Sequence, residues 1–108
     1  MDAHDLHSEL SLALHAAVAQ RLPSQPEVLD RARRKIDEWL ADGGSSSPLL
    51  KRWSEILALP PQQIAAVLTE RSEEAAWLRK ASPFAGALDP RERERILRAV
   101  RQRFESAA

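Results

Sequence analysis

The three histidines are the side chains best suited to acid–base chemistry near neutral pH, and all lie within the first fifteen residues. His4 and His7 are one helical turn apart, and Asp2 or Asp5 could complete a pair of metal ligands with them. A chain end is a poor rigid frame, and no third strong ligand is fixed nearby. His15 adjoins an apolar stripe, where we expect it to support the core through a backbone contact. We therefore predict neither a metal site nor a cofactor.

The sequence also lacks the patterns that accompany covalent catalysis or phosphate binding. A catalytic serine needs a base that is oriented by a third group, and no nucleophile elbow accompanies these histidines. The glycines before Lys51 differ from a phosphate-binding loop, because no glycine directly precedes the lysine and no Ser or Thr follows it. We predict a protein that is not an enzyme and has no catalytic residues.

The stretch 82–98 is better suited to binding. Its first part is a loop too apolar for a solvated linker, so we expect it either to fold onto the core or to await a partner. Its second part begins a helix with arginines along one face, and arginine is a frequent anchor of protein interfaces. The predicted partner-binding residues are Ser82, Pro83, Phe84, Leu88, Arg91, Arg95 and Arg98.

Two other interpretations of the basic residues remain open. The first is a solvated face, because Asp30 with Arg34 and Glu94 with Arg98 are spaced for neutralising pairs within helices. The second is a DNA-binding regulator, which requires the basic residues of 31–35 and those of the last helix to form one surface. The formal net charge of zero weakens that alternative, since nucleic-acid binding normally needs a concentrated basic face.

Apolar residues recur at three- and four-residue intervals along most of the chain, which predicts helices. The expected helices cover 4–21, 26–40, 48–59, 61–69, 72–81 and 90–105. Pro, Gly, Ser and Asp mark their ends, and we expect N-caps at Ser24 or Gln25, Ser47, Ser72 and Asp89. Asp89, Pro90 and Glu92 have the spacing of a capping box.

These elements predict an all-α protein, a compact orthogonal bundle of five to six helices in one domain, 1–108. Two hairpins would be joined by a flexible Gly/Ser connector at 43–47. We expect Trp39, Trp53 and Trp77 to pack in the core; one of them half-exposed beside Phe84 would instead be a partner anchor. With no cysteine, no membrane span and no secretion signal, we expect a soluble cytoplasmic protein.

Four segments resemble a family of small bacterial helical proteins of toxin–antitoxin-like operons. They read LHAAVAQRL, DEWL, KRWSEIL and LRKASPFAGALDPRER, and the resemblance covers residues 14–98. It implies an antitoxin, which binds and neutralises or regulates another protein, and it implies no catalytic residues. Glu94 departs from the pattern, because similar proteins tend to have an aromatic residue there. The expected partner is another protein or a second copy of this chain.

Overall fold

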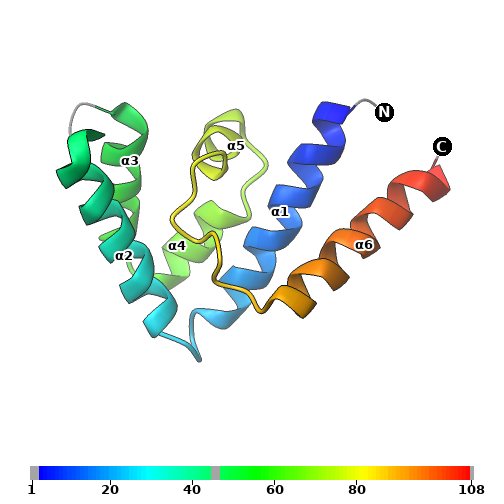
Figure 1. Ribbon diagram of the computed structural model, residues 1–108, viewed down its shortest axis with the longest axis horizontal. Coiled ribbons are helices and arrows are strands. Elements are labelled where there is room, and N and C mark those ends of the chain that lie inside the picture. Colours follow the sequence, from blue (N-terminus) through cyan, green and yellow to red (C-terminus); the bar gives the residue numbers. More distant parts are fainter. Residues whose placement is uncertain (1–2, 45–46, 108) are drawn as a thin grey trace.

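The computed structural model describes residues 3–44 and 47–107, and the side chains of 6–43 and 47–106. In this part of the chain all regular structure is helical, which confirms the predicted all-α fold (Figure 1). The elements are α1 (Ala3–Arg21), α2 (Glu27–Trp39), the π-helical turn η1 (Leu40–Gly44), α3 (Pro48–Leu57), α4 (Pro61–Leu68), α5 (Glu73–Arg79) and α6 (Pro90–Ala107). None of these helices combines the length and hydropathy that crossing a bilayer requires.

Three predicted N-caps are confirmed, because a side-chain oxygen accepts a hydrogen bond from a backbone N–H two or three residues later. The pairs are Ser47 Oγ with Leu50 N–H (3.3 Å), Ser72 Oγ with Ala75 N–H (3.1 Å) and Asp89 Oδ1 with Arg91 N–H (2.8 Å). Each cap satisfies an otherwise unpaired donor and is worth about 1 kcal/mol. Helix α2 ends at Trp39, and Gly43, the expected stop, lies four residues later in η1 with a φ of 101° that favours glycine. Residues 45 and 46 of the connector lie outside the described part of the chain.

The capping predictions were wrong at two positions. Helix α2 is preceded by Pro26 with no side-chain cap, and Ser24 Oγ donates instead to the carbonyl oxygen of Arg21. Glu92 forms an ion pair with Arg21. A charge-assisted hydrogen bond to a guanidinium outweighs a reciprocal bond to a backbone N–H, so Glu92 connects α6 to α1.

Helix α1 lies at the centre of the arrangement (Figure 1). Helix α6 packs against one side of it and α4 and α5 against the other, while α2 and α3 form the hairpin farthest from α6. The Cα radius of gyration is 14.3 Å, against about 13 Å for a compact domain of this length. The excess agrees with the outlying position of α6, which makes its main contacts with α1.

Trp53 is the centre of the core. Its side chain is fully buried at 0% exposure, as predicted, and its Nε1–H donates to the carbonyl oxygen of Leu78 over 2.9 Å. Its ring meets that of Phe84 edge-to-face, with 5.9 Å between ring centroids. Such a pair stabilises by about 1 kcal/mol beyond the area it buries. One residue of α3 thus connects the end of α5 to the following loop.

Trp39 and Trp77 do not pack in the core, contrary to the prediction. Their exposed fractions are 37% and 40%. Leu40 takes the inward position at the end of the α2 stripe, and Leu78 takes it on α5, so each neighbouring tryptophan faces outward. The error arises because two adjacent apolar residues at a helix end both fit a three- or four-residue interval.

Candidate functional site

The loop between α5 and α6 folds onto the core, which is one of its two predicted outcomes. The side chains of Pro83, Phe84 and Leu88 are all buried. Gly86 has a φ of 83°, a left-handed conformation that lets the loop turn, and the tip at Ala85 and Gly86 remains exposed. A partner could therefore reach the tip, whereas the three buried side chains stabilise the fold.

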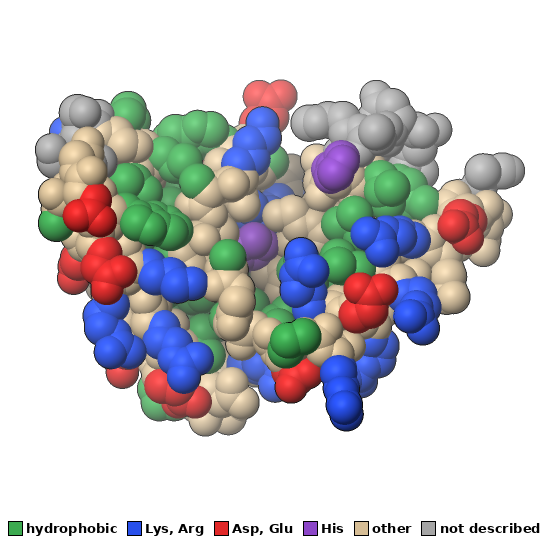
Figure 2. Space-filling model, in the orientation of Figure 1, with side chains coloured by type: hydrophobic (Ala, Val, Ile, Leu, Met, Phe, Trp, Pro, Cys, Tyr) green, Lys and Arg blue, Asp and Glu red, His purple; other side chains and the backbone are tan. Residues whose placement is uncertain are grey.

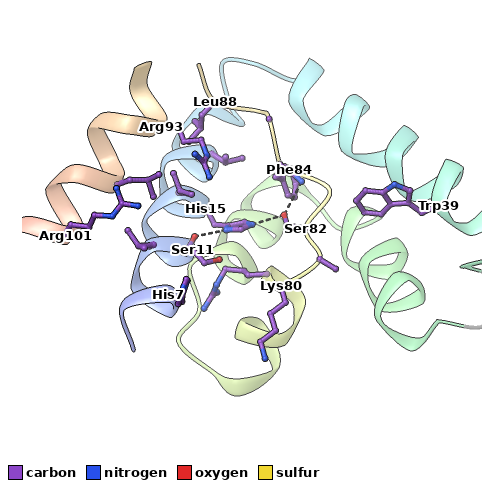
Figure 3. A pocket seen from close by; sticks show the side chains of 18 residues that line it. His7, Ser11, His15, Trp39, Lys80, Ser82, Phe84, Leu88, Arg93 and Arg101 are labelled. Carbon is purple, nitrogen blue, oxygen red and sulfur yellow. Dashed lines mark hydrogen bonds between the residues drawn. The ribbon is translucent and has the colours of Figure 1, made fainter. Parts of the chain in front are cut away.

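One hydrogen bond from His15 holds the loop to α1, and a second, within α1, orients the ring. The Nδ1 atom of His15 lies 2.7 Å from the carbonyl oxygen of Ser11, and its Nε2 atom lies 2.7 Å from Ser82 Oγ (Figure 3). A carbonyl only accepts, so Nδ1 carries the proton and a neutral ring accepts the Ser82 hydroxyl proton at Nε2. Ser82 Oγ also accepts from the N–H of Phe84 over 3.1 Å. Both groups are thus satisfied within the fold, and the predicted supporting role of His15 agrees with these contacts.

The surroundings of His15 favour its neutral form. Its exposed fraction is 8%, and burial is the largest cause that lowers its pKa below the ordinary value. The positive charge of Arg79 lowers this pKa further, although the bond to the Ser11 carbonyl partly opposes both effects. Arg79 is itself buried, and its Nη1 donates to the carbonyl oxygen of Glu70 over 2.7 Å. The guanidinium therefore has a structural function between α4 and α5.

A cleft of about 560 Å³ opens around His15 and Ser82. Its volume is within the usual range for small-molecule sites. It is bounded by α1, the loop and α6, and Trp39 lies at its far side beyond the loop (Figure 3). Apolar side chains from all three elements line it: Leu10, Leu14, Val18, Phe84, Leu88 and Leu97. We refer to this hollow as the central cleft.

Positive charge borders the central cleft. Arg93 and Arg101 reach it from α6 and Lys80 from just after α5 (Figure 3), and Arg79 at the end of α5 also lines it. Among the described residues that line it there is no Asp or Glu. Arg93 and Arg101 lie four residues before and after Leu97, so they share its side of the helix. That spacing groups both arginines with Leu97 in the sequence, but it does not show that this side of the helix borders a cleft, and neither arginine is among the predicted site residues.

The seven predicted site residues divide between separate places. Ser82, Phe84 and Leu88 line the central cleft, and buried Pro83 lines none of the hollows described here. The three predicted arginines lie around a shallow depression elsewhere on α6, with Pro90 and Glu94. We call Arg91, Arg95 and Arg98 the arginine face. Its arginines are exposed, and Arg98 lies 3.9 Å from Glu94.

The basic residues of α2 and α6 do not form one surface. The two helices lie at opposite sides of the molecule, and Figure 2 shows separate groups of Lys and Arg side chains over each. On α2, Arg33 Nε donates to the carbonyl oxygen of Leu57 and Lys35 Nζ to that of Ala85. Part of the basic character of α2 therefore serves contacts within the fold.

No metal-binding cluster of three His, Cys, Asp or Glu side chains exists among the described residues. The proposed partners of His7 lie outside them, because the side chains of Asp2, His4 and Asp5 are not described. Comparison with protein-family models, with curated proteins and with solved structures found no match to this chain.

Proposed function

We propose that this chain is a non-enzymatic protein-binding module of the cytoplasm, an antitoxin-like partner that neutralises or regulates another protein. The binding surface is the arginine face of α6. The observation that supports it is the exposure of Arg91, Arg95 and Arg98 on a helix whose main contacts are with α1. Arginine forms bidentate hydrogen bonds to carboxylates, so the matching partner surface is acidic.

The attachment of α6 to the body makes it a suitable binding element. Leu97 and Val100 are buried, and Glu92 pairs with Arg21 at the base of the helix. These contacts hold one side of α6 and leave the arginine face free to meet a partner. A helix ordered in advance loses little conformational entropy on binding.

A protein partner is favoured over DNA by the distribution of charge. The basic residues of α2 and α6 lie on opposite sides, and Glu94 stands among the arginines of the arginine face. Duplex affinity grows with the number of phosphates that one surface neutralises. Three arginines beside a carboxylate supply few such contacts, whereas they are sufficient to anchor a protein interface.

The test is co-expression with the neighbouring gene products, followed by gel filtration. We expect one of them to co-elute with the wild-type chain, and we expect R91E/R95E to abolish co-elution. The matched control is R31E/R34E, which makes the same charge change at exposed arginines of α2. Loss of co-elution in both variants, or a wild-type chain that elutes alone or only with itself, would contradict the proposal.

A further inference from the structure

The central cleft combines an apolar floor with a positively charged border, and the proposed protein binding through the arginine face involves neither. Its floor combines aliphatic side chains of α1 with Leu97 of α6, and its border carries only positive charge among the described lining residues. In a hollow with low-dielectric walls, charges of one sign reinforce one another and attract the opposite charge. The cleft therefore favours an anion over a cation.

The polar atoms of His15 and Ser82 in the cleft already have hydrogen-bond partners within the fold, so they do not require a polar ligand. His15 uses both ring nitrogens, and Ser82 Oγ is shared between His15 and the N–H of Phe84. Arg79 is committed to the carbonyl oxygens of Leu68 and Glu70. A ligand's apolar part can therefore lie along the floor without displacing these bonds.

Three exposed cations border the cleft, Lys80, Arg93 and Arg101, and the two arginines flank the apolar floor at Leu97. Both are exposed side chains of α6 that border the cleft, two helical turns and about 12 Å apart along the axis. Leu97 lies between them on the same side. A ligand with one anionic group beside an apolar body fits this surface, because the anion can bind a guanidinium while the apolar body packs on Leu97.

We propose that the central cleft binds a small free carboxylate with an apolar chain, of the chemical class of medium-chain fatty acids. The carboxylate is held by Arg93 or Arg101, and the chain lies along Leu10, Leu14 and Leu97. This site lies on another side of α6 from the arginine face, and the two share no lining residue. The inference thus goes beyond the proposed function and stands or falls independently of it.

The test is calorimetric titration of the full chain with dodecanoate below its micelle concentration, with dodecanol and dodecylammonium as matched probes. We expect saturable binding of one dodecanoate per chain, weaker binding of dodecanol and none of dodecylammonium. R93Q/R101Q should weaken dodecanoate binding by about tenfold or more, the loss expected for one charge-assisted hydrogen bond. The matched control R91Q/R95Q removes the same charge from the same helix and should bind like the wild type.

The position of the ligand is tested separately by NMR. On addition of dodecanoate, amide shifts should concentrate in residues 10–18, 79–88 and 93–101. Absence of binding, equal affinity for dodecylammonium, equal weakening in both arginine variants, or shifts concentrated in α3 and α4 would each overturn the proposal. Because R91Q/R95Q leaves the cleft intact, failure of this proposal is distinguishable from failure of protein binding through the arginine face.

Discussion

His15 Nε2 and Ser82 Oγ lie 2.7 Å apart although 67 positions separate the two residues in the sequence. This bond joins the middle of α1 to the loop that precedes α6, and it does so inside the central cleft. The loop is thus held from two sides, since Phe84 also packs on Trp53. The shape of the cleft depends on both contacts.

The His15 contact predicts a pH dependence of stability. Burial lowers the pKa of His15 in the folded chain, so as pH falls below about 6.5 the unfolded chain takes up the proton first. The free energy of unfolding should therefore decrease through this range, level off below the folded-state pKa, and show no such segment in H15Q. Urea unfolding between pH 8 and pH 5 measures it. An identical decrease in H15Q would contradict the assignment.

Removing the Ser82 hydroxyl should destabilise the fold without unfolding it. S82A leaves the buried Nε2 of His15 and the N–H of Phe84 without their partner, which costs about 1 to 3 kcal/mol. Urea unfolding of S82A provides the value. The control is S54A at an exposed position of α3, where we expect a change within about 0.5 kcal/mol. Equal effects in the two variants would show that the hydroxyl contributes nothing to stability.

We expect the same Trp-to-Phe substitution to have very different effects on stability at Trp53 and Trp77. W53F loses the bond to the Leu78 carbonyl and leaves unfilled volume at a fully buried site, so we expect a loss of about 2 to 4 kcal/mol. W77F at an exposed position should change stability by less than about 0.5 kcal/mol. Thermal and urea unfolding compare the two. Similar losses would place Trp77 in the core.

We expect loss of the ion pair between Arg21 and Glu92 to loosen the attachment of α6 to α1. The hydrogen bond from Arg21 lowers the pKa of Glu92 below its ordinary value of 4.5, so the pair stabilises the fold at neutral pH, and this stabilisation is lost as pH falls through the lowered pKa. E92Q should speed amide hydrogen exchange in α6 at neutral pH while leaving α3 and α4 unchanged. E94Q is the control, because the ion pair of Glu94 with Arg98 lies within α6. Equal exchange in E92Q and the wild type would contradict this attachment.

Most of the fold could be predicted from local signals. Proline and capping side chains act over three or four residues, so Ser47, Ser72 and Asp89 marked helix starts without knowledge of the tertiary structure. Glu92 failed as a capping residue because its partner, Arg21, lies 71 positions away. The residues next to Glu92 in the sequence do not reveal that Arg21 competes for its carboxylate.

The candidate site was less predictable for the same reason. The central cleft is assembled from α1, the loop and α6, and nothing in the sequence states that these segments meet. Periodicity could have grouped Arg93 and Arg101 with Leu97, but the side of a helix that borders a hollow depends on its neighbours. The burial of Phe84 likewise follows from Trp53, a residue in another helix.

The closure of Trp53 by Phe84 also bears on synthesis by the ribosome. Helices α1 to α4 emerge first, yet the indole remains uncovered on one edge until the α5–α6 loop has left the exit tunnel. The nascent chain therefore exposes apolar surface at Trp53 until this loop emerges and Phe84 covers it.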